Sequence, residues 1–171
     1  MTYNIHPLFV HFPIAFLFIY SLIKIVPVKR WLPKVSWKDI ERVLLVVGVL
    51  GAFAALSTGE AAESLVRSNP QLVETHAVFA TAATWMYGLL LSGEILLLLI
   101  PWIPANFQAV KIVKALTIVK DILTHRILSI VITILGLLTL SLTGLLGGVI
   151  THGVTADPVA PFVLRILGIT L

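Results

Sequence analysis

The chain has 171 residues, of which 58% are hydrophobic and only 12% are charged, and its mean hydropathy is strongly positive. A soluble domain of this length cannot cover so much apolar surface, so the composition indicates that a bilayer solvates most side chains. The absence of cysteine excludes disulfides, iron–sulfur clusters and thioether-linked haem. The net charge of +4 is explained by loop residues that orient a membrane protein, and nucleic acid is not an expected partner.

Four apolar segments approach the ~20 residues that a helix needs to span a bilayer. They cover residues 7–26, 43–58, 76–100 and 127–150. The first segment is not a typical cleavable signal peptide, because it lacks a basic start and contains Pro7, His11 and Pro13. The sequence therefore predicts a single all-α transmembrane domain over residues 1–171, built as an up-and-down four-helix bundle.

Two other segments are partly apolar but unsuited to crossing the membrane. Residues 105–124 place several charged side chains on one helical face, which predicts a short interfacial helix before the fourth span or an extension of that span. Residues 158–171 are apolar but few, and they contain Arg165. We therefore expect them to form an interfacial tail.

Basic residues are concentrated in two connections. Ten of the twelve lie between the first and second spans, between the third and fourth or, for Lys24, at the adjoining end of the first span, and the other two are Arg67 and Arg165. Because basic loops stay in the cytoplasm, this distribution predicts that both termini are extracytoplasmic. The expected location is the cell or cytoplasmic membrane.

Four of the five histidines gather on one side of this topology. His6 and His11 lie at the start of the first span, His76 at the start of the third, and His152 just after the fourth. A single histidine at this depth is commonly hydrated or hydrogen-bonded to a carbonyl. Several ionisable groups that converge within a membrane instead favour a ligand site. His125 lies at the opposite, cytoplasmic end.

Glycines at helical spacing accompany these histidines. Gly144 and Gly148 precede His152 in the fourth span. Such a pair typically allows two membrane helices to pack closely, and a flat macrocycle between helices requires the same lack of side chains. The glycines alone do not choose between these functions, and the sequence leaves a homo-oligomer open.

Three motifs carry a resemblance to a known family. They are HPLFVHFPIA at residues 6–15, TGEAAE at 58–63 followed by ETH at 74–76, and GGVITHGV at 147–154. With these motifs the chain resembles the bacterial and archaeal membrane family known as domain of unknown function 2231. Members similar to this chain occur fused to Rieske or cytochrome c domains, so the resemblance implies a redox setting and a redox partner of that kind.

The leading interpretation of the cluster is a b-type haem held by two histidines from different helices, which would favour electron transfer. His11 and His76 are the expected axial pair, because each enters from the start of a spanning helix. His6 precedes Pro7 and His152 precedes a helix-ending Gly153, so these two are expected to be neighbouring groups or alternative ligands.

Two other interpretations stay open. The first is a zinc, iron or copper site built from the same four histidines with Glu60 or Glu74. Against it, five helical residues turn a net 140°, so His6 and His11 do not readily face one ion. The second is a structural or interaction subunit without a cofactor. Glu94, alone in the third span, is expected to be protonated, paired or part of a proton path.

Overall fold

The computed structural model describes residues 6–63, 68–108 and 110–170, and helices dominate this part of the chain. Its body consists of α1 (His6–Ile25), α3 (Trp37–Glu63), α4 (Pro70–Leu99) and α7 (Arg126–His152). Each of these four helices is long and apolar enough to cross a membrane. They confirm the predicted all-α membrane fold with four spanning helices.

Shorter helices connect and follow the spans. They are α2 (Val28–Trp31), the 3-10 turn η1 (Ile100–Trp102), α5 (Ala105–Gln108), α6 (Lys111–Thr124), the 3-10 turn η2 (Val154–Ala156) and α8 (Ala160–Ile166). α6 is the short helix that the sequence predicts before the fourth span. It packs along α4, most closely at Gly93, where an added Cβ would lie 2.9 Å from the Leu123 Cβ.

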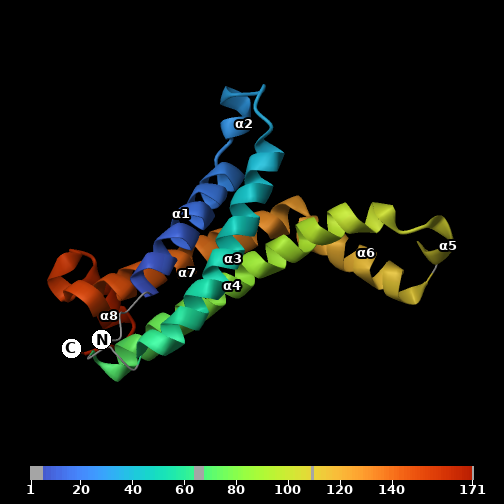
Figure 1. Ribbon diagram of the computed structural model, residues 1–171. Helices are drawn as coiled ribbons and strands as arrows, with labels where there is room; N and C mark the ends of the chain where they lie inside the picture. Colours follow the sequence, from blue (N-terminus) through green and yellow to red (C-terminus); the bar gives the residue numbers. More distant parts are fainter. Residues whose placement is uncertain (1–5, 64–67, 109, 171) are drawn as a thin grey trace.

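The long helices form two hairpins, because α1 packs along α3 and α4 packs along α7. In Figure 1 the two hairpins meet at one end of the molecule and diverge toward α2 on one arm and α5 on the other. α1 and α4 begin at the shared end, and α3 and α7 finish there. This up-and-down arrangement therefore brings four segments that are distant in sequence to one end.

Local signals explain where the helices start and stop. The Asn69 side chain accepts a hydrogen bond from the Gln71 amide, and Pro70 occupies the first helical position of α4, a typical N-terminus. α7 ends at Gly153, whose φ of 81° suits glycine. α3 runs beyond the predicted segment 43–58 at both ends, because flanking polar residues continue the helix.

The core lies where the hairpins cross. Its buried apolar residues are Leu17, Tyr20, Leu45, Val49, Ala52, Ala83, Tyr87, Leu90 and Leu140. α1 and α3 approach closely there, since a Cβ on Gly48 would lie 2.5 Å from the Leu17 Cδ2 atom. The Tyr87 hydroxyl, buried among these groups, is 2.6 Å from the Ser21 Oγ atom, so its polar group is satisfied inside the bundle.

The C-terminal tail folds back against the shared end and does not cross the membrane. Ala160, Leu164 and Ile169 are buried against the start of α4 and the end of α7. The Asn69 side chain also donates a hydrogen bond to the Thr170 carbonyl. The tail therefore covers one side of the end at which the histidines collect.

Candidate functional site

The shared end of the hairpins holds two imidazoles that are packed between helices. We call it the histidine end, and it comprises the first turn of α1, the second turn of α4, the last turns of α3 and the last turns of α7. His6 comes from α1 and His76 from α4. The two residues lie at the same end of the bundle (Figure 1), although 70 positions separate them in the sequence.

His6 is fixed against the end of α3. Its Nδ1 atom lies 3.0 Å from the Thr58 Oγ1 atom, and the Thr58 hydroxyl itself donates to the Ala54 and Ala55 carbonyls. Because that hydroxyl proton is already used, Nδ1 of His6 is the donor to the Thr58 oxygen. Gly59 lies against the same ring, and an added Cβ there would be 3.2 Å from Cε1 of His6.

His76 is fixed against α7 in the same manner. Its Nδ1 atom lies 3.0 Å from the Thr143 carbonyl oxygen. A carbonyl only accepts, so Nδ1 carries the proton and the neutral ring has its lone pair on Nε2. Gly147 is the glycine beside this ring, because a Cβ there would lie 3.1 Å from Cε1 of His76. Each imidazole is thus hydrogen-bonded to a neighbouring helix and backed by a glycine of that helix.

The other predicted site residues lie elsewhere. His11 is exposed, and its Nδ1 atom bonds to the Pro7 carbonyl of its own helix. His152 is exposed as the last residue of α7. Gly144 and Gly148 face open space, since a Cβ on either would meet no atom within 4 Å. The structure places His6 and His76 at one end of the bundle, each against a neighbouring helix, whereas His11 and His152 are exposed.

The donor set at the histidine end is small. Among residues 6–63, 68–108 and 110–170, no group of three or more His, Asp or Glu side chains is arranged to hold a metal ion. Glu60 and Glu74, which the metal-site interpretation adds to the histidines, are both exposed. The described residues therefore offer a pair of imidazoles and no larger ligand cluster.

Sequence reasoning did not assign the residues that position the imidazoles. Thr58 and Gly59 lie in the motif at 58–63, and Gly147 opens the motif at 147–154, so the motifs contained a usable signal. The Thr143 carbonyl carries no sequence signal, because any residue type supplies a backbone carbonyl. Helix packing alone identifies it as the acceptor for His76.

Glu94 is paired within the bundle. Its Oε2 atom lies 3.1 Å from Nε of Arg42, which α3 supplies, whereas the Ser92 hydroxyl bonds to the Gly88 carbonyl of its own helix. Of the states expected for Glu94, the one observed is an ion pair with a residue of a neighbouring helix. This pair joins the two hairpins away from the histidine end.

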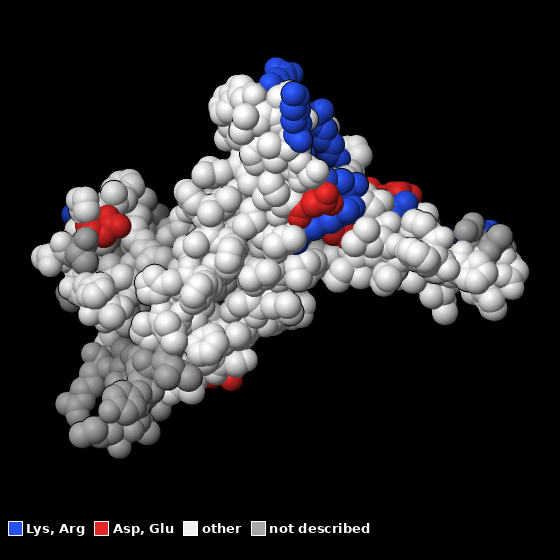
Figure 2. All heavy atoms as spheres, turned by 45° about the horizontal axis from the view of Figure 1, so that its top comes forward, with Lys and Arg blue, Asp and Glu red and all other residues white. Residues whose placement is uncertain are grey.

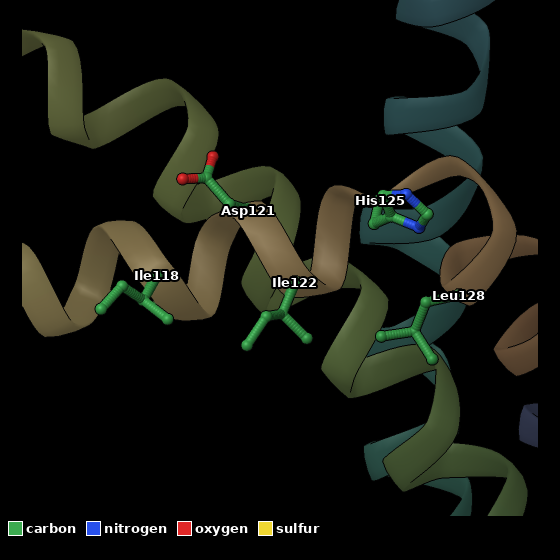
Figure 3. Close-up of a pocket in the computed structure, with 5 residues that line it drawn as sticks. All are labelled: Ile118, Asp121, Ile122, His125 and Leu128. Atoms are coloured by element: carbon green, nitrogen blue, oxygen red, sulfur yellow. The ribbon is translucent and has the colours of Figure 1, made fainter.

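An open groove of about 490 Å³ lies at the junction of α6 and α7. It is lined by Ile118, Asp121, Ile122, His125 and Leu128. In Figure 3, Asp121 and His125 lie on one side of α6 and Ile118 and Ile122 on the other. The groove is at the far end of α7 from the histidine end and contains a single imidazole, so it does not belong to the candidate site.

Four spanning helices with a pair of packed imidazoles at one end define an integral membrane protein of the helical-bundle class. The chain belongs to the family described as "Predicted membrane protein (DUF2231)", which matches residues 2–158. That match includes all four spanning helices and all five histidines. No curated protein and no solved structure matches the chain.

Proposed function

We propose that this protein binds a b-type haem at the histidine end, with His6 and His76 as the axial ligands, and that it transfers electrons there. The observation that carries the proposal is that these two imidazoles, from different hairpins, are each fixed against a neighbouring helix at the same end of the bundle. A haem needs one imidazole on each face, and two separate helices supply that geometry more readily than two positions on one helix.

The number of ligands supports haem over a bare metal ion. Zinc, iron or copper bound by protein alone usually takes three or four side chains, and the described residues assemble no such group. A haem iron needs only two axial ligands from the protein, because the porphyrin supplies four nitrogens. A pair of imidazoles meets that requirement.

The hydrogen bonds of both rings support a ligand role. Metal-binding imidazoles commonly donate their second N–H to a carbonyl or another acceptor, which fixes the tautomer and the ring orientation. For His76 the acceptor is the Thr143 carbonyl, so its lone pair lies on Nε2. For His6 the acceptor is the Thr58 hydroxyl. Gly59 and Gly147 let each ring lie against the neighbouring helix.

When bound, the haem supplies a one-electron redox couple. Filling both axial positions with histidine favours electron transfer over oxygen chemistry. The chain itself holds each of the two ligands in place through a hydrogen bond to a neighbouring helix. The partner we propose is a soluble redox protein, such as a Rieske or cytochrome c protein, that approaches the histidine end.

We further propose that the histidine end and both termini are extracytoplasmic. Ten of the twelve basic residues lie in the two connections at the diverging ends of the hairpins or in the adjoining ends of the spanning helices. Such connections are retained in the cytoplasm. Electron exchange would then take place on the extracytoplasmic side of the membrane.

An absorption spectrum of the detergent-purified protein, oxidised and then reduced, tests the proposal. We expect a low-spin six-coordinate spectrum with a sharp reduced α-band. His6→Ala and His76→Ala should each abolish haem retention or convert the spectrum to a high-spin form, because each removes an iron ligand.

His11→Ala is the matched control, since His11 lies five residues from His6 on the same helix but is exposed. It should keep the native spectrum. Loss of haem in His11→Ala with a normal His6→Ala spectrum would restore the pair expected from the sequence. A colourless protein that contains zinc or no metal would refute the haem proposal.

A further inference from the structure

The tip of the first hairpin concentrates positive charge. It comprises α2 and the adjoining ends of α1 and α3, and its basic residues are Lys24, Lys29, Arg30, Lys34, Lys38 and Arg42. Figure 2 shows blue side chains gathered over this tip. Carboxylates within the bundle neutralise only some of these charges. The six residues therefore fall into two groups, those with an ion-pair partner in the bundle and those outside the ion pairs of the described residues.

Three of the basic residues are paired internally. Nζ of Lys29 lies 2.8 Å from the Glu41 carboxylate, and Nζ of Lys24 lies 3.8 Å from the same group. Arg42 is paired with Glu94 and also lies 3.6 Å from the Asp39 carboxylate. The partners of these cations are inside the protein, so these residues stabilise the fold.

The remaining three, Arg30, Lys34 and Lys38, form what we call the basic tip. All three are exposed. In the described part of the chain, none of the five ion pairs includes them. Three like charges on one short segment repel one another, so an external anion would stabilise them.

Apolar side chains share the basic tip. Trp31 is 69% exposed and Leu32 is 55% exposed. The Trp37 indole donates a hydrogen bond to the Leu32 carbonyl, which ties the segment back to the start of α3. Tryptophan at the end of spanning helices is typical of the membrane–water interface. The surface therefore suits a partner that is both anionic and apolar.

We propose that the basic tip binds the headgroups of anionic phospholipids. The phosphates would pair with Arg30, Lys34 and Lys38, while Trp31 and Leu32 insert at the level of the acyl boundary. Because α1 and α3 are both spanning helices, the tip is held beside a lipid surface. Juxtamembrane basic residues are attracted to anionic lipid, each by about fivefold in affinity.

Native mass spectrometry in a non-ionic detergent tests this inference, with phosphatidylglycerol and phosphatidylcholine titrated separately. The native protein should retain phosphatidylglycerol preferentially, and the preference should fall at high salt. In the variant Arg30→Gln/Lys34→Gln/Lys38→Gln, the preference for phosphatidylglycerol over phosphatidylcholine should be at least tenfold lower than in the native protein. Its thermal unfolding midpoint should stay close to the native value, because the ion pairs among the described residues do not include these three.

The control variant Lys111→Gln/Lys114→Gln/Arg126→Gln removes the same charge from the other hairpin, where these residues are also exposed. It should keep most of the lipid preference. An equal loss in the two triple variants would refute a site at the basic tip. Displacement of the lipid by millimolar inorganic phosphate, or preferential capture of an RNA oligonucleotide over phosphatidylglycerol, would also refute the proposal.

Discussion

At the scale of single residues, the histidines differ in what their side chains contact. His6 and His76 pack against glycines on adjacent helices, whereas His11 bonds to its own helix and is exposed. A glycine beside an imidazole matters because a methyl group there would contact the ring directly. Gly147 meets this condition, and Gly148, one residue later, does not.

We therefore predict that Gly147→Ala weakens haem binding while Gly148→Ala does not. A Cβ at position 147 would lie 3.1 Å from Cε1 of His76, so the ring must move and its hydrogen bond to Thr143 is strained. Overpacking of this kind typically costs about 1–3 kcal/mol, or roughly 5- to 150-fold in affinity. The loss of haem affinity is measured as an increased rate of haem transfer to an acceptor apoprotein.

Gly144→Ala and Gly148→Ala serve as controls, since a methyl group at either position meets no atom within 4 Å. Both should transfer haem at the native rate. Faster transfer from these two variants than from Gly147→Ala would instead support the role in cofactor binding that the sequence predicts for Gly144 and Gly148.

At the scale of helices, the two hairpins diverge away from the histidine end (Figure 1), and an ion pair joins them in addition to the apolar core. The Arg42–Glu94 pair connects α3 with α4, and the exposed fractions of its side chains are 25% and 22%. A partly buried charge without its partner is destabilising, since the lost solvation is no longer offset. This pair should therefore hold the hairpins in register.

We predict that Glu94→Gln lowers stability by about 1–2 kcal/mol, because it leaves Arg42 with only the exposed Asp39 nearby. The thermal unfolding midpoint in detergent is the measurement. The double variant Arg42→Gln/Glu94→Gln should recover part of the loss, since neither charge is then left unpaired.

Asp121→Asn provides a comparison at an ion pair that joins no two long helices. Asp121 pairs with its sequence neighbour Lys120, and its side chain is 64% exposed, so its removal should change stability by less than about 0.5 kcal/mol. A larger effect for Asp121→Asn than for Glu94→Gln would contradict a linking role for the Arg42–Glu94 pair.

At the scale of the whole molecule, an even number of spans places the start of α1 and the end of α7 at the same end (Figure 1). Polar side chains cannot easily be moved through the bilayer, so the basic connections determine which side of the membrane this end occupies. The side matters for the proposed function, because it would limit which soluble redox partners could reach the histidine end.

Reporter fusions test the orientation. A reporter that is active only outside the cytoplasm should be active at both termini, and a cytoplasm-only reporter should be active when inserted between η1 and α6. Cytoplasmic reporter activity at either terminus would invert the proposed topology, and with it the side of the membrane on which we propose electron exchange.

The sequence by itself determined the four spans, the short helix before the fourth span and the set of histidines near one end. These features follow from local rules, since a bilayer requires about 20 apolar residues in each helix. The rotation of each helix about its axis follows from no local rule.

Only the tertiary structure decided that His6 packs beside Gly59, that Gly147 rather than Gly144 or Gly148 touches His76, and that Arg42 reaches Glu94. His6 and His11 differ by a net 140° around one helix, so a bundle packs at most one of them inward. The neighbouring helix determines which one, because contacts between segments more than fifty residues apart set the face of α1 that is buried.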